Sequence, residues 1–166
     1  MTNKEKFVKL AEDEVKSNSL YLWGGQGEKV LETNPKKLLK METSAANVGR
    51  ILKCLANKLI TGLSMDKAKY FDCSGLIVFI LQTLGLIESD YTANDIYRKL
   101  CSAIKKSELR RGDLVFINSG SKITHVGIYA GDGLVIEAVG RDYGVMKRQI
   151  SKNSWNVFGR VKCLEE

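Results

Sequence analysis

The stretch Phe71-Asp72-Cys73-Ser74-Gly75-Leu76 places a cysteine at the expected first turn of a helix, with a short residue before it and a glycine soon after. Helix N-termini stabilise anions, which favours the thiolate form of Cys73. A thiolate nucleophile also needs a proton shuttle, and histidine is the usual one near neutral pH. The chain has a single histidine, His125. An isolated cysteine and histidine are more often structural, but the surrounding residues favour a catalytic pair.

Hydrophobic periodicity divides the chain into a helical first part and a strand-rich second part. Apolar residues at helical spacing predict helices over 4–17, 35–40, 45–61 and 73–84, and Thr92 is expected to cap a further helix through Leu100. After Gly112 the pattern predicts strands over 113–118, 124–130, 134–139, 145–150 and 156–162. Helices followed by an antiparallel run predict a single α+β domain over residues 1–166.

The helix that begins at Cys73 is the most apolar of the chain and should pack on the sheet. Its apolar stripe consists of Leu76, Ile77, Ile80, Leu81 and Leu84. Cys73 lies one turn before Ile77 on the same side, so its thiol is expected to face the strands.

A predicted hairpin brings a carboxylate towards His125. Apolar residues at 126, 128 and 130 share one face of the first strand, and those at 134, 136 and 138 share one face of the second. A three-residue loop, 131–133, aligns the two apolar sets, whereas a two-residue turn would separate them. Glu137 then lies opposite Gly127 and diagonal to His125, at a backbone distance of roughly 7–8 Å. We expect Gly127 to leave room for Glu137 to reach the imidazole; the alternative is an ordinary exposed glutamate.

Composition excludes several classes of protein. Hydrophobic residues make up 44% and charged residues 27%, as in ordinary globular proteins, and no apolar run approaches the length of a membrane span. The four cysteines have no metal-type spacing and there is one histidine, so no metal site is expected. The N-terminus lacks the apolar segment of a signal peptide, so synthesis in a reducing cytosol with free thiols is expected.

Positive charge is concentrated in residues 26–70. The chain has a net charge of +7, and this segment holds nine Lys or Arg against four Asp or Glu. No nucleic-acid motif accompanies the charge, so no nucleic-acid partner is expected. An anionic polymer or an acidic substrate is one interpretation, and a solvated surface without a partner is the other.

Four motifs, in order, resemble those of the NlpC family of papain-like bacterial cell-wall peptidases. They are Tyr21-Leu22-Trp23-Gly24-Gly25, Asp72-Cys73-Ser74-Gly75, Arg111-Gly112-Asp113-Leu114-Val115-Phe116 and His125-Val126-Gly127-Ile128-Tyr129. The resemblance implies a papain-like fold and hydrolysis of amide bonds in peptidoglycan stem peptides, often between γ-D-glutamate and a diamino acid. It departs from the family in the long segment 26–70, which is expected to be a basic helical insertion beside the groove.

The resemblance assigns roles to individual residues. Cys73 would be the nucleophile, His125 the base, and Glu137 the third polar residue, a position that is often histidine in the family. Tyr21 matches a tyrosine whose hydroxyl lies beside the nucleophile. Substrate contacts are expected from Asp72, Ser74, Trp23 and Arg141; Arg141 is a candidate for a substrate carboxylate. The implied mechanism is acyl transfer through a thioacyl-enzyme without a cofactor.

Three alternatives stay open at this point. The chain could be an N-acetylmuramoyl-L-alanine amidase of the cysteine-histidine amidase type, an inactive cell-wall-binding module, or a thiol acyltransferase acting on lipid. Because the expected substrate lies outside the membrane and no export signal is seen, we expect release by phage lysis or delivery with a virion, with a non-classically delivered toxin as a further alternative.

Overall fold

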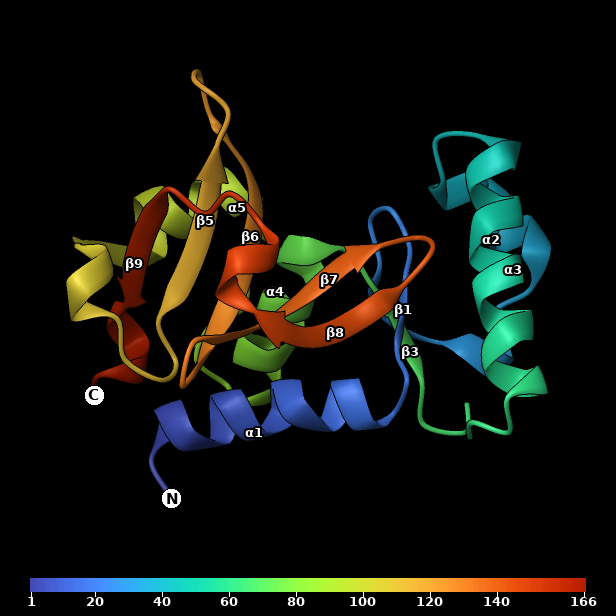
Figure 1. Ribbon diagram of the computed structural model, residues 1–166, viewed down its shortest axis with the longest axis horizontal. Coiled ribbons are helices and arrows are strands. Elements are labelled where there is room, and N and C mark those ends of the chain that lie inside the picture. The colour runs from blue at the N-terminus through green and yellow to red at the C-terminus, as the bar shows by residue number, and fades with distance from the viewer.

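The computed structural model describes residues 1–166 and confirms the predicted α+β class. Helices occupy the first part of the chain and an antiparallel sheet the second (Figure 1). The helices are α1 (Asn3–Lys16), α2 (Pro35–Met41), α3 (Ala45–Ile60), α4 (Cys73–Thr83) and α5 (Ala93–Asp95). Short 3-10 turns are η1 (Val30–Glu32), η3 (Lys106–Glu108), η4 (Ile150–Lys152) and η5 (Lys162–Leu164). The helix predicted to run through Leu100 is instead a single turn, α5, followed by the π-helical turn η2 (Ile96–Leu100).

The main sheet has six antiparallel strands in the order β4-β9-β5-β6-β7-β8. Five of them lie where the alternation predicts strands: β5 (Leu114–Asn118), β6 (Ile123–Gly131), β7 (Leu134–Gly140), β8 (Gly144–Gln149) and β9 (Val157–Val161). The sixth, β4 (Cys101–Ile104), was not predicted; it pairs with β9 at the edge of the sheet.

A second, small sheet was also not predicted. Its order is β1-β3-β2, with β1 (Leu20–Tyr21) parallel to β3 (Lys69–Phe71) and β2 (Gln26–Lys29) antiparallel to it. The three strands are two to four residues long, too short to show a clear alternation. They carry the chain into and out of the segment 26–70, which we call the insertion.

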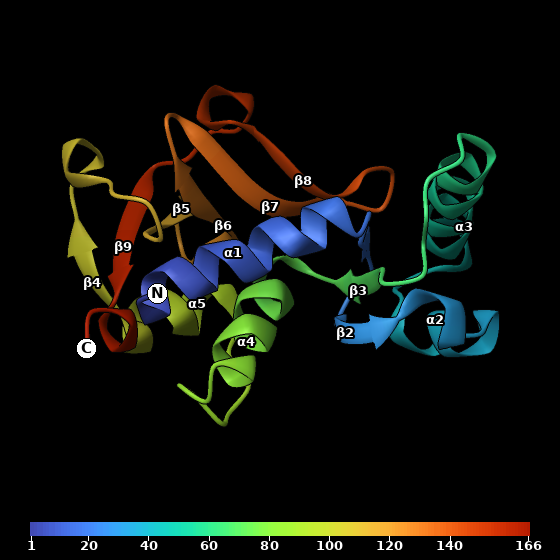
Figure 2. The same cartoon turned by 90° about the horizontal axis from the view of Figure 1, so that it is seen from below.

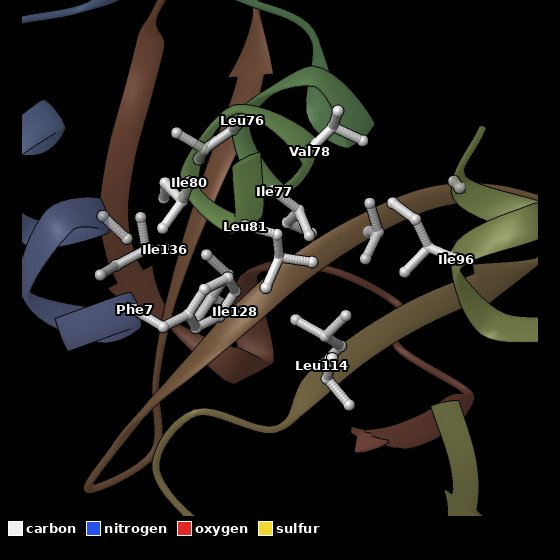
Figure 3. Close-up of a cluster of buried hydrophobic side chains, with 14 of the residues drawn as sticks. Phe7, Leu76, Ile77, Val78, Ile80, Leu81, Ile96, Leu114, Ile128 and Ile136 are labelled. Carbon is white, nitrogen blue, oxygen red and sulfur yellow. The ribbon is translucent and has the colours of Figure 1, made fainter. Parts of the chain in front are cut away.

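The main core lies between the six-stranded sheet and the helices α1 and α4, which cover the same face (Figure 2). Four of the five residues of the predicted stripe of α4 are buried here: Leu76, Ile77, Ile80 and Leu81 are at most 1% exposed. The fifth, Leu84, is the C-cap of the helix and is only partly buried. The four buried residues meet Phe7 of α1 and apolar residues of the central strands, including Leu114, Ile128 and Ile136 (Figure 3).

The insertion has its own hydrophobic cluster at one end of the molecule (Figure 1). Leu38 of α2 and Ile51 of α3 pack with Leu20, Leu22 and Tyr70 from the small sheet and its connections. Ser44 caps α3 by accepting a hydrogen bond from the N–H of Asn47, and Asn34 caps α2 ahead of Pro35. Packing against the small sheet therefore connects the insertion to the strand that leads into α4.

The β6–β7 hairpin has the predicted register, but its turn differs from the prediction. Ile128 pairs with Ile136 and Tyr129 with Val135, so the two apolar sets face the same side. The strands continue to Gly131 and Leu134, and a two-residue turn, Asp132-Gly133, joins them with both residues at positive φ. A register shift between Tyr129 and Gly131 absorbs the extra residue, which is why a two-residue turn does not separate the apolar sets.

Candidate active site

Cys73 is the first residue of α4, and Asp72 fixes the start of this helix. One carboxylate oxygen of Asp72 accepts the N–H of Gly75 at 2.6 Å, and the other accepts the N–H of Gly24 at 2.9 Å. The N–H of Asp72 is donated in turn to the carbonyl of Gly25. A Cβ at Gly75 would collide with that carbonyl. The glycine pair and the Asp-Cys-Ser-Gly motif are thus in direct contact, and together they set the position of the half-buried thiol.

His125 lies on β6 between Cys73 and Glu137. Its Nε2 is 2.9 Å from Oε1 of Glu137, so Nδ1 is the ring nitrogen left to interact with Cys73. Burial lowers the pKa of His125, but the hydrogen bonds and negative charges of Cys73 and Glu137 outweigh it and raise the pKa to about 9. The imidazole therefore holds its proton at neutral pH, beside a sulfur that can attack a carbonyl.

Glu137 is a buried carboxylate held by several donors. Its side chain is 1% exposed, and Arg148 of β8 donates to both of its oxygens at 3.3 and 3.4 Å. Asn153 donates to Oε1 at 3.3 Å. Burial raises the pKa of Glu137, but the hydrogen bonds from His125 and Arg148 outweigh it and lower the pKa below its ordinary value. Glu137 is thus ionised and fixed, as a group that orients an imidazole must be.

Trp155 covers the imidazole of His125. The two rings are stacked with centroids 5.2 Å apart and planes 14° from parallel. A Cβ at Gly127 would approach Trp155 to 3.0 Å and Val135 to 2.7 Å. The expectation that Gly127 makes room for Glu137 is therefore corrected: the space beside Gly127 is occupied by the indole and by Val135. The indole therefore covers one face of the imidazole that bonds to Glu137.

Tyr21 lies at the end of β1, where it pairs with Phe71, two residues before Cys73. Burial, followed by the negative charges of Cys73 and Asp72, raises the pKa of Tyr21 to about 12. Its hydroxyl is therefore a proton donor at every pH at which the protein would work. Trp23, two residues on, is 53% exposed and free to contact a ligand.

The remaining residues expected to contact substrate differ in their availability. Ser74 is half-buried and its hydroxyl donates to Asp72 at 3.3 Å. Both oxygens of Asp72 already cap α4 and hold the glycine pair, so this side chain has a structural task. The guanidinium of Arg141 donates two hydrogen bonds to the carboxylate of Glu42, with Nε–Oε2 and Nη2–Oε1 distances of 2.9 and 2.6 Å. No pattern in the sequence indicated that the guanidinium of Arg141 is already paired.

Four residues that surround the site were not predicted from the sequence: Trp155, Arg148, Asn153 and Glu42. Arg148 could have been found, because extending the strand register to β8 places it opposite Val135 and diagonal to Glu137. Trp155 and Asn153 lie in an irregular segment without periodicity, and Glu42 lies in the insertion. No local pattern points from these positions to the site.

The other three thiols lie in different environments. Cys54 and Cys101 are buried, and burial raises the pKa of Cys54 and raises that of Cys101 to about 12. Burial also raises the pKa of Cys163. No group of His, Cys, Asp or Glu side chains is arranged to hold a metal ion, and no helix is both long and apolar enough to cross a bilayer.

The sequence matches known proteins mainly in its second part. The chain is 41% identical over 95 residues to the probable endopeptidase p60 of Listeria grayi, which covers 55% of the chain and 18% of that relative. It is 36% identical over 88 residues to the murein DD-endopeptidase MepH of Escherichia coli K12, covering 51% and 32%. It is 34% identical over 99 residues to the bifunctional muramidase/DL-endopeptidase CwlT of Bacillus subtilis 168, covering 55% and 29%. The chain thus spans at most about a third of each of these relatives.

The fold matches solved structures over nearly the whole chain. The NlpC/p60 domain of the peptidoglycan hydrolase SagA superimposes with a TM-score of 0.61 at 19% identity, covering 95% of this chain and 98% of that domain. The P60 domain of antigen MAP1204 from M. avium subspecies paratuberculosis gives a TM-score of 0.61 at 21% identity, covering 98% of each. The sequence profile of the NlpC/P60 family matches residues 56–159, which is more than half of the chain and includes Cys73, His125 and Glu137. The chain belongs to the NlpC/P60 family.

Proposed function

We propose that this chain is a cysteine endopeptidase that hydrolyses an amide bond in peptidoglycan stem peptides through a Cys73–His125–Glu137 triad. The observation that carries the proposal is the placement of a half-buried thiol at a helix N-terminus, beside an imidazole whose other nitrogen is held by a buried carboxylate. The endopeptidase names of the relatives support it.

The reaction proceeds in two halves. The thiolate of Cys73 attacks the amide carbonyl carbon, a C–S bond forms, and the carbonyl electrons move to oxygen. The tetrahedral intermediate collapses, the C–N bond breaks, and the imidazolium of His125 gives its proton to the leaving amine. Water then attacks the thioester while His125 takes a proton from it, and cleavage of the C–S bond returns the thiolate and releases the acid.

Two kinds of donor are available for the oxyanion. The first N–H groups of α4 have no partner within the helix, and Asp72 satisfies only that of Gly75. The N–H of Cys73 therefore remains for the substrate oxygen. The hydroxyl of Tyr21, which keeps its proton, is the second donor.

The bond cleaved is proposed to be that between γ-D-glutamate and the diamino acid. Digestion of purified peptidoglycan, followed by mass spectrometry, tests both the reaction and the bond. We expect disaccharides that keep an L-alanyl-D-glutamate dipeptide, together with peptides that begin at the diamino acid. Peptides that begin at L-alanine would identify an amidase instead, and a digest identical to that of a Cys73→Ala control would identify a wall-binding module.

The stacking of Trp155 on His125 leads to a prediction. Trp155→Ala should lower kcat about tenfold to a hundredfold, because water would compete for the bond between His125 and Glu137 and the ring would lose its orientation. Trp155→Phe, which keeps an aromatic face, should retain most of the activity. Steady-state kinetics on a stem peptide, with thermal unfolding to confirm folding, measures the difference; equal kcat in Trp155→Ala and wild type would contradict it.

The insertion is proposed to bind an anionic wall polymer. Lys36, Lys37 and Lys40 of α2 are exposed and form no ion pair, so their charges are free for a ligand. Replacing all three with glutamate should weaken binding to purified cell walls and flatten its dependence on salt, because screening acts on exposed charges.

A matched variant provides the control for this test. Lys105, Lys106 and Lys162 are also exposed, and they follow β4 or β9, the strands at the end of the molecule opposite the insertion (Figure 2). Their replacement by glutamate changes the net charge equally and should leave most of the binding intact. If both triple variants lose the same affinity, the binding reports only the overall charge.

A further inference from the structure

Two ion pairs join the insertion to the turn between β7 and β8. In one pair the insertion supplies the acid, and in the other it supplies the base. Glu42, which ends α2, accepts two hydrogen bonds from Arg141 of the turn. Arg50, on α3, donates two to Asp142, the next residue of the turn, at 2.9 and 2.7 Å. The insertion and the turn thus each contribute one acidic and one basic side chain. The paired residues are 99 and 92 positions apart in the sequence.

The two pairs differ in burial. The side chains of Arg50 and Asp142 are about half exposed, and exposed pairs of this kind contribute little. The side chain of Glu42 is fully buried and that of Arg141 is 17% exposed. Burial raises the pKa of Glu42, but the hydrogen bonds from Arg141 and from two backbone N–H groups outweigh it and lower the pKa to about 2. Glu42 is therefore a buried anion at every working pH. Removing Glu42 or Arg141 leaves the charge of the other side chain without its counter-ion.

The buried pair also contacts the segment that carries Tyr21. The guanidinium of Arg141 lies over the ring of Tyr21, 5.2 Å from its centroid, in cation–π geometry. Oε2 of Glu42 accepts the N–H of Trp23 at 3.3 Å. Arg141 thus holds the side chain of Tyr21, while Glu42 holds the backbone two residues further on. Tyr21 in turn pairs with Phe71, the end of the strand that leads into Cys73, and the charge of Cys73 contributes to its raised pKa.

We propose that Glu42 and Arg141 are positioning residues that hold Tyr21 in place beside Cys73, so that the insertion acts on the reaction through this tyrosine. The inference rests on the proposed function, in which Tyr21 donates to the oxyanion. It assigns Arg141 a role other than binding a substrate carboxylate, because the N–H groups of its fork are already given to Glu42.

Kinetics on a soluble stem peptide separate the two roles of Arg141. Glu42→Gln and Arg141→Gln should each lower kcat roughly tenfold to a hundredfold, since small displacements of a reacting group have effects of this size. The KM should change less than twofold in each. A substrate-binding Arg141 would give the reverse result: a raised KM in Arg141→Gln, with Glu42→Gln affecting it only indirectly.

Double variants test whether the effect passes through Tyr21. Tyr21→Phe removes the hydroxyl, so adding Glu42→Gln or Arg141→Gln to it should lower kcat no further, a non-additivity expected of groups that act in series. A merely structural pair would lower the melting temperature and would still reduce kcat in the Tyr21→Phe background. That additive result, or wild-type kcat in both single variants, would overturn the proposal.

The exposed pair supplies the matched control. Arg50→Gln and Asp142→Asn break the second pair between the same two segments, and each should keep kcat within twofold of wild type. Should Glu42→Gln fail to fold, Arg141→Lys replaces it: lysine keeps the charge near Tyr21 but cannot pair with Glu42 at two points. Its kcat should lie between those of Arg141→Gln and wild type; the wild-type value would count against the proposal.

Alkylation separates failure of this inference from failure of the proposed function. If wild-type protein cleaves no stem peptide, the proposed function fails, and the rate constant for alkylation of Cys73 by iodoacetamide takes the place of kcat. The rate constants of Glu42→Gln and Arg141→Gln should then change in the same direction and to a similar extent as that of Tyr21→Phe. Unchanged alkylation in all three variants would overturn the positioning role, because Tyr21 would then not act on Cys73.

Discussion

Iodoacetamide in limiting amount at pH 6 is expected to alkylate Cys73 before the other three cysteines, and the alkylated protein is expected to lose hydrolysis of peptidoglycan. The proton that His125 holds up to about pH 9 places a positive charge beside the sulfur and stabilises its anion. Cys54 and Cys101 are buried, and burial raises the pKa of Cys163. Peptide mapping by mass spectrometry identifies the labelled residue.

Variants of the same pair make the test specific. Cys73→Ser should fold normally and lose activity by about 10⁴-fold or more, as expected when the nucleophile of a catalytic unit is removed. His125→Ala should slow both alkylation and hydrolysis, since it removes the charge that stabilises the thiolate and the acid that protonates the amine. Preferential labelling of another cysteine, with Cys73 inert at pH 6, would mean that the nucleophile is assigned wrongly.

Replacing Glu137 with alanine is expected to lower turnover tenfold to a thousandfold, by analogy with orienting residues in triads. Glu137→Gln should keep the fold and part of the activity, because an amide oxygen can still accept the N–H of the imidazole. Glu137→Gln therefore removes only the negative charge, whereas Glu137→Ala removes the charge and the hydrogen bond to His125. Wild-type turnover in Glu137→Ala would remove this residue from the site.

The pH dependence of kcat/KM provides a further test of the contact between Glu137 and His125. Because the pKa of His125 is raised to about 9, the imidazolium needed by the leaving amine is present below that pH and is lost above it. The wild-type kcat/KM should therefore fall on the alkaline side near pH 9. In Glu137→Gln the negative charge that helps to raise this pKa is gone, so the alkaline limb should move to lower pH. A limb that stays in place would show that Glu137 does not act on His125.

Arg148 provides the control for this second prediction. It donates to both oxygens of Glu137, including Oε1, which also meets Nε2 of His125. Arg148→Gln removes this neighbour of the carboxylate but keeps both members of the bond between Glu137 and His125. We expect a smaller loss of activity than in Glu137→Ala. An equal loss would indicate that the penalty in Glu137→Ala comes from an unpaired arginine.

Local sequence patterns were sufficient to predict the helix and the hairpin that carry the proposed triad. The apolar stripe of α4 predicted both its burial and its start at Cys73, and Asp72 supplied the cap. Alternation in β6 and β7 fixed the hairpin register, so Glu137 could be paired with His125 before the fold was known. Such inferences succeed because a helix and a short hairpin depend on neighbouring residues, whose side-chain directions follow from the backbone period.

Patterns along the sequence were thus enough to predict the α+β class, the family and the contact between His125 and Glu137. The surroundings of these residues depend on long-range packing: the parallel pairing of Leu20 with Tyr70, the ring of Trp155 on His125, and the ion pair between Glu42 and Arg141. These contacts join segments 30 to 99 residues apart, and no periodicity links their members. Their geometry is set by how the insertion and the irregular segment before β9 pack on the finished sheet, a property of the whole chain.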